Sequence, residues 1–83
     1  MNSDDKKFIE AVGQLIREAR TRQGISSTEL AKRLGMKSPS HLTRIERGEV
    51  EARLSTFKLI CQELSVDAAE LMYEAHERAL KSE

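Results

Sequence analysis

The 83-residue chain has few cysteine, proline and aromatic residues: one cysteine, one proline, one tyrosine, two phenylalanines and no tryptophan. Cys61 alone cannot form an internal disulfide, and together with His41 and His76 it makes too small a set for a structural zinc site. We therefore expect no metal and no cofactor, with stability that comes from packing alone. Because Ala, Leu, Glu, Lys and Arg are abundant and favour helix, the composition predicts an all-α fold.

Long hydrophobic runs are also missing. No apolar run is longer than about three residues, whereas roughly 20 are needed to cross a bilayer. No apolar stretch follows Lys6 and Lys7 as a secretion signal requires, so we expect no membrane contact and a cytoplasmic location. No Ser/His/Asp set, paired carboxylates or glycine-rich phosphate loop can be assembled, and we expect neither catalytic residues nor enzyme activity.

The charges balance in number but are unevenly distributed. The chain has 14 Lys and Arg against 14 Asp and Glu. Residues 30–58 hold seven basic and three acidic side chains, a net charge of +4, so the remainder carries −4. A basic middle between acidic ends favours one face for a polyanion such as DNA, while a solvated charge pattern is the alternative.

Five segments carry apolar side chains at the spacing of an amphipathic helix. They predict helices over about residues 4–23, 27–34, 39–47, 54–64 and 68–81. Left-handed glycines are expected to end the first three helices, at Gly24, Gly35 and Gly48. The pattern contains neither an internal repeat nor a low-complexity linker, so we expect one domain that covers residues 1–83.

Helix starts are marked by capping residues. Ser26 and Asp67 each precede a glutamate by three residues, which is the spacing of a capping box. Ser38 before Pro39 predicts a hydroxyl cap with the proline in the first helical position. Residues 54–64 lack such a cap.

The two short helices at 27–34 and 39–47 meet across a glycine-containing turn, as in the helix-turn-helix unit that presents its second helix to the DNA major groove. In chain order the motifs are Gly24-Ile25-Ser26, Glu29-Leu30-Ala31, Leu34-Gly35 and Leu42-Thr43-Arg44-Ile45-Glu46-Arg47-Gly48, then Phe57, Ile60, Leu64, Val66 and Leu71. This ordered set resembles the Xre/Cro-type helix-turn-helix family of phage-repressor-like regulators. The resemblance covers residues 12–72 and implies a five-helix, lambda-repressor-like DNA-binding domain, with residues 73–83 as a C-terminal helix extension.

Two features depart from the family pattern. Many members have Gln in place of Ser27, at a position that often contacts a phosphate. The turn from Gly35 to Ser38 is one residue longer than the common spacing, so we align the recognition helix backwards from Ile45 and Glu46.

A helical wheel divides the recognition helix into two sides. The inner side holds Leu42, Ile45 and Glu46. The outer side holds Ser40, Arg44 and Arg47, with His41 and Thr43 on its flanks. Since Arg44 can donate two hydrogen bonds to one guanine, we expect this outer side to read the major groove. The expected base contacts are Ser40, His41, Thr43 and Arg44.

Donors around the recognition helix are expected to contact DNA phosphates, because such contacts fix register on the duplex. They are Ser26, Ser27, Thr28, Lys37, Arg47 and Arg53. In the resembling family the glutamate of the Ile-Glu-Arg-Gly segment pairs with an arginine on the first helix, which matches Arg20. The resemblance thus implies a structural pair between Arg20 and Glu46. We expect Cys61 to be a small buried hydrophobe rather than a redox switch.

The C-terminal helix carries apolar side chains beyond those that its core stripe needs. Together with one residue on the outer side of the fourth helix, they predict a two-fold dimer interface, with a frayed tail as the alternative. Its residues are Leu59, Met72, Tyr73, His76 and Leu80. We therefore expect a homodimeric repressor that binds double-stranded DNA. An antitoxin-like or accessory protein that also binds a protein partner, and a helical adaptor that binds protein alone, are the alternatives.

Overall fold

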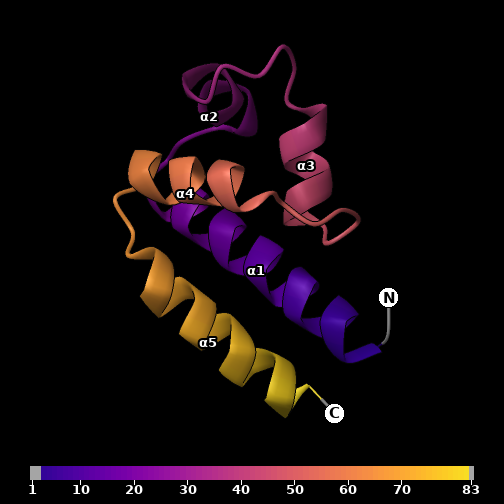
Figure 1. Cartoon of the computed structure of the whole chain (residues 1–83). Coiled ribbons are helices and arrows are strands. Elements are labelled where there is room, and N and C mark those ends of the chain that lie inside the picture. The colour runs from indigo at the N-terminus through magenta and orange to yellow at the C-terminus, as the bar shows by residue number, and fades with distance from the viewer. Residues whose placement is uncertain (1–2, 83) are drawn as a thin grey trace.

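The computed structural model describes residues 3–82, and these form five α-helices without a strand (Figure 1). The helices are α1 (Ser3–Arg22), α2 (Ser27–Arg33), α3 (Ser40–Glu46), α4 (Leu54–Glu63) and α5 (Ala68–Lys81). Helices α1 and α5 pack side by side and antiparallel, while α2 and α3 lie on the other side of α1 and α4 crosses it. The predicted all-α fold is confirmed. No helix begins or ends more than one residue away from its predicted bound.

One hydrophobic core joins all five helices. Its largest fully buried side chains are Ile16, Leu30, Leu42, Ile45, Ile60, Leu64 and Cys61. On α1 the buried apolar side chains are Ile9, Ala11, Leu15, Ile16 and Ala19, while Phe8 and Val12 are partly buried beside them. Cys61 lies inside this core, where burial raises the pKa of its thiol by disfavouring the thiolate. The position suits a small packing residue, as expected.

Helices α1 to α4 end in the same way. The residue that follows each helix cap has a positive φ: Gly24 at 70°, Gly35 at 76°, Gly48 at 73° and Ser65 at 55°. The N–H of the next residue then donates to a carbonyl five residues earlier, as from Ile25 to Arg20 (3.1 Å) and from Glu49 to Arg44 (2.9 Å). This is the Schellman motif, which pairs carbonyls that a helix end leaves free. The three glycine ends are confirmed; the left-handed Ser65 was not predicted.

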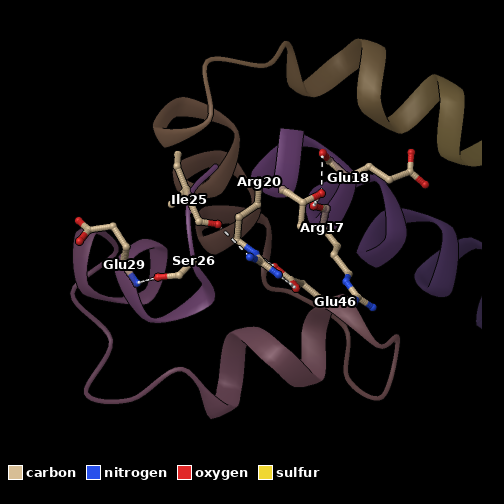
Figure 2. A network of polar contacts seen from close by, with 8 residues as sticks. Arg17, Glu18, Arg20, Ile25, Ser26, Glu29 and Glu46 are labelled. Carbon is tan, nitrogen blue, oxygen red and sulfur yellow. Dashed lines mark hydrogen bonds and ion pairs between the residues drawn. The ribbon is translucent and has the colours of Figure 1, made fainter. Parts of the chain in front are cut away.

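At the starts of α2 and α5 the predicted cap residues accept a helix N–H, which is one half of each capping box; the Glu29 carboxylate pairs with Arg33 instead. The Ser26 hydroxyl accepts a hydrogen bond from the Glu29 N–H at 3.0 Å, and the Asp67 carboxylate accepts one from the Glu70 N–H at 3.0 Å. Figure 2 shows the first of these bonds. Each cap pairs one of the N–H groups that a helix start leaves without a partner.

The predicted hydroxyl cap of α3 is wrong. The helix begins at Ser40, and its cap residue is Pro39, with a helical φ of −77° and ψ of −5° and no side-chain hydrogen bond. The Ser38 hydroxyl lies 2.8 Å from the Ser40 hydroxyl instead. Because Pro39 already adopts the helical conformation and has no N–H, the turn brings the Ser38 hydroxyl to another hydroxyl rather than to the backbone.

Helix α5 completes the core rather than projecting from it. Ala75 is fully buried in the core, and Arg78 donates hydrogen bonds to both carboxylate oxygens of Glu18 on α1, at 2.8 and 3.3 Å. This pairing lowers the pKa of Glu18 and raises that of Arg78. Ala75 and Arg78 therefore belong to the packing of the protomer, although both lie in the segment 73–83 that was expected to be an extension of the core.

Candidate nucleic-acid interface

Helix α3 presents one buried and one exposed side. Leu42, Ile45 and Glu46 are 0%, 2% and 7% exposed, which places them on the inner side. The outer side is polar, with Ser40, His41, Arg44 and Arg47 exposed and Thr43 half-buried. Helix α3 is thus held by its apolar side, and its basic side is open to solvent.

A bidentate ion pair fixes α3 to α1 (Figure 2). Arg20 donates from Nε to Glu46 Oε2 at 2.7 Å and from Nη2 to Glu46 Oε1 at 2.9 Å. Its remaining amino group, Nη1, donates to the Ile25 carbonyl at 2.9 Å. The two side chains are only 11% and 6% exposed, and the hydrogen bonds to Glu46 raise the pKa of Arg20. One guanidinium therefore ties α1, the turn before α2 and the end of α3 together.

Two glycines allow the end of α3 to approach α1 closely. A Cβ atom on Gly13 would lie 2.3 Å from the Ile45 carbonyl oxygen, and one on Gly48 would lie 2.5 Å from the Glu10 Cγ. Both distances are too short for any side chain, so glycine sets the separation of the two helices here. This contact was not predicted, although a glycine in the middle of a predicted helix was a signal for it.

The expected phosphate donors surround α3 in the chain and are mostly exposed. The exposed ones are Ser26, Thr28, Lys37, Arg47 and Arg53, and Ser27 is half-buried. Since the Ser26 oxygen accepts the capping bond from Glu29, its hydroxyl proton remains free to be donated. These residues come from the start of α2, from the turn before α3 and from the loop after it.

Glu49 lies between the two arginines of the exposed side. Its Oε1 atom is 3.9 Å from Arg44 Nε, and its Oε2 atom is 3.8 Å from Arg47 Nη1. This arrangement was not predicted, because Glu49 follows the helix-ending Gly48 in a polar segment that is typical of a loop. The Schellman turn brings that residue back beside α3.

The expected dimer residues are exposed apolar or aromatic side chains on α4 and α5. Leu59, Met72, Tyr73 and Leu80 are 49%, 39%, 67% and 61% exposed, and His76 is exposed as well. One of them, Met72, also lines an open groove of about 500 Å³ between α1, the loop after α3 and α4. Apolar side chains line most of it, among them Phe8, Phe57 and the 76% exposed Leu54.

The described part of the chain contains neither a membrane-spanning helix nor a metal-binding cluster. Within residues 3–82, no helix has the length and apolar character needed to span a membrane. In the same range, no three His, Cys, Asp or Glu side chains lie close enough together to hold a metal ion.

The helix pair α2–α3, with its anchored inner side and its basic outer side, defines a helix-turn-helix DNA-binding domain. A sequence model of the helix-turn-helix family matches residues 16–71, which is more than half of the chain. Two crystal structures of the clp gene regulator ClgR from Corynebacterium glutamicum are similar, each at 30% identity. One has a TM-score of 0.77 and covers 84% of this chain and 90% of that chain; the other has a TM-score of 0.81 and covers 90% and 80%. No curated protein matches the sequence.

The chain therefore belongs to the helix-turn-helix family, and the resemblance to Xre/Cro-type regulators is confirmed. The matched residues 16–71 fall inside the segment 12–72 that carries the resemblance. Family and similar structures together identify a DNA-binding transcriptional regulator rather than an enzyme.

Proposed function

We propose that the protein is a sequence-specific regulator that binds double-stranded DNA as a homodimer and represses transcription by occupying promoter DNA. Repression of this kind needs only a DNA-binding face and a dimer face. Because the protein would have to reach chromosomal DNA, the proposal includes a cytoplasmic location. The same mechanism needs no cofactor.

The exposed side of α3 carries this proposal. Its outward groups are hydrogen-bond donors spread along a helix whose seven residues span about 10 Å at 1.5 Å per residue. That length fits a major groove roughly 12 Å wide. In this arrangement the base contacts would come from Ser40, His41, Thr43 and Arg44. The phosphate contacts would come from Ser26, Ser27, Thr28, Lys37, Arg47 and Arg53.

Arg44 would supply most of the base discrimination. Its guanidinium can donate two hydrogen bonds to O6 and N7 of one guanine, and such a pair is worth about 1–3 kcal/mol. Ser40 and His41 offer single, less selective hydrogen bonds. Lys37, in the turn, would add affinity without sequence preference, because a phosphate contact carries no base information.

Selection of bound sequences from a random duplex pool tests the proposal directly. Wild type should enrich one motif, and its affinity should fall steeply with salt because each neutralised phosphate releases counterions with a log–log slope of about −0.9. Arg44→Ala should relax the preference at one position of each half-site, whereas Lys37→Ala should weaken all duplexes alike. A pool without enrichment, or an affinity that does not respond to salt, would contradict sequence-specific binding.

A second function is favoured by one observation, the apolar groove next to Leu54 and Met72. In an antitoxin-like or accessory protein, such a surface would hold a protein partner while α3 binds the operator. The two candidates differ in the protein's oligomeric state without a partner. A homodimer in the purified protein supports the first, and a monomer that still selects a duplex supports the second.

A further inference from the structure

The position of Glu49 beside the exposed side of α3 is determined by the backbone. Gly48 has a φ of 73°, and the Glu49 N–H donates to the Arg44 carbonyl at 2.9 Å. These two features return the chain to the last turn of α3. The carboxylate therefore lies beside Arg44 and Arg47 because of how the helix ends, although half of its own side-chain surface is exposed.

The ion pair with Glu49 involves one edge of the Arg44 guanidinium. The closest atoms are Arg44 Nε and Glu49 Oε1, at 3.9 Å. The two terminal amino groups of Arg44 are left for another acceptor, and a guanine offers two acceptors at the matching spacing. An arginine that is already oriented loses less side-chain entropy when it binds. Glu49 thus places an opposite charge beside Arg44 Nε and leaves the two terminal amino groups as the donors for a base.

The same carboxylate opposes binding to DNA of any sequence. It adds a negative charge near the phosphates, and it pairs with Arg47, which would otherwise be free to contact one. Non-specific complexes depend almost wholly on phosphate contacts, so they bear this cost without compensation. A specific complex regains it through the oriented Arg44.

We propose that Glu49 is a positioning residue that sets sequence specificity by acting through Arg44. The inference deepens the proposed function and rests on it, because it requires that Arg44 reads a base. Glu49 itself needs no contact with DNA. Its effect is on the ratio of the affinity for the preferred duplex to the affinity for an unrelated one.

The variant Glu49→Gln keeps the shape of the side chain and removes the charge, and Glu51→Gln is its matched control. Glu51 lies two residues further along the same loop, is exposed, and forms no ion pair in the described structure. Dissociation constants are measured for the selected duplex and for a scrambled duplex of equal length, at one salt concentration. Glu49→Gln should lower the affinity ratio roughly two- to tenfold, mainly by tighter binding of the scrambled duplex. Glu51→Gln should tighten both duplexes by the same factor and leave the ratio unchanged.

A double-mutant cycle separates positioning from simple charge. In an Arg44→Ala background, Glu49→Gln should no longer change the ratio, since the side chain on which it acts is gone. An unchanged ratio in Glu49→Gln alone, or the same drop with and without Arg44, overturns the inference. If wild type does not prefer its selected duplex over the scrambled one, the proposed function fails first and the inference fails with it.

Discussion

At the scale of single residues, Arg20 has a structural role, because it neutralises the buried carboxylate of Glu46 and donates two hydrogen bonds to it. Arg20→Ala would leave a carboxylate that is 6% exposed without its counter-charge. Breaking such a pair should lower the free energy of unfolding by about 3 kcal/mol. In a domain of this size the melting temperature should then fall by more than about 10 °C. Thermal unfolding followed by circular dichroism measures this shift.

A paired replacement distinguishes the loss of one partner from the loss of the pair. Arg20→Met together with Glu46→Leu removes both charges and keeps most of the buried volume, so it should recover much of the stability that Arg20→Ala loses. DNA binding should recover less, because nothing then links α3 to the Ile25 carbonyl. A melting temperature that Arg20→Ala leaves unchanged would mean that the pair adds nothing to stability.

Side-chain roles could be predicted where they depend on local pattern, and not where they depend on the path of the backbone. The wheel places Leu42 inside and Arg44 outside because a helix has a fixed period. The pairing of Arg20 with Glu46 spans 26 residues and could come only from the family resemblance. The third bond of Arg20, to the Ile25 carbonyl, and the place of Glu49 follow from turns whose geometry the sequence analysis did not include.

At the scale of helices, the contact between α1 and α3 depends on Gly13. Replacing a mid-helix glycine by alanine usually stabilises a helix by about 1 kcal/mol. Here a Cβ atom would lie 2.3 Å and 2.6 Å from the carbonyl oxygens of Ile45 and Glu46. Because both obstacles are backbone atoms, we expect Gly13→Ala to destabilise the fold by about 1–3 kcal/mol. Urea unfolding measures the change.

The next residue of α1 supplies the control for this substitution. Gln14 is exposed, so Gln14→Ala should leave stability unchanged within about 0.5 kcal/mol. Gly13→Ala should also weaken DNA binding, since α3 has to move away from α1 to make room. Stabilisation by Gly13→Ala would show that the helices separate without cost.

The end of α4 contains the one non-glycine residue of the described chain in the left-handed region, Ser65, at a φ of 55°. A side chain in this conformation destabilises the folded state by roughly 1–2 kcal/mol. Glycine avoids that cost, but it loses more conformational entropy on folding, which offsets part of the gain. Ser65→Gly should therefore raise the free energy of unfolding by about 0.5–1 kcal/mol. Ser55→Gly is the control, because glycine within α4 should lower the free energy of unfolding. Equal signs for the two variants, measured by urea unfolding, would rule out backbone strain at Ser65.

The positions of the helix ends could thus be predicted, whereas the residue or group that completes each end could be predicted only in part. Three of the four left-handed ends carry glycine, a direct signal, whereas Ser65 takes the same conformation without one. At the start of α3 the serine–proline pair indicated the right place but the wrong cap, because Pro39 itself occupies the cap position. Propensity locates a boundary, and the neighbouring backbone decides which group completes it.

At the scale of the whole molecule, the exposed apolar stripe of α5 is the strongest argument for a dimer. At 100° per residue, its residues Met72, Tyr73, His76 and Leu80 fall within about 100° of arc, beside the buried stripe that contains Ala75. Since Ala75 is in the core, a truncation that removes it would disrupt the fold of the protomer and would not test the interface alone. Substitutions on the exposed stripe are the suitable test.

The double variant Tyr73→Gln and Leu80→Gln removes apolar surface without adding charge, so it leaves the electrostatic attraction to DNA intact. We expect it to sediment as a monomer at concentrations where wild type is a dimer. Leu54→Gln is the control, because it makes the same change at a more exposed leucine outside the stripe. If Leu54→Gln gives monomers instead, the interface lies over the groove; if neither variant does, it lies elsewhere.

The same variants connect protein symmetry to DNA symmetry. One recognition helix reads about four base pairs, which cannot separate a single site from a genome of competitors, so two copies are needed. A two-fold dimer places its recognition helices about 34 Å apart, and the selected motif should be an inverted repeat with half-sites centred roughly 10 base pairs apart. Inserting five base pairs between the half-sites turns one of them to the opposite face of the duplex and should abolish the gain from the second half-site. The monomeric Tyr73→Gln and Leu80→Gln variant should bind the original and the lengthened duplex equally, because it never engages both half-sites at once.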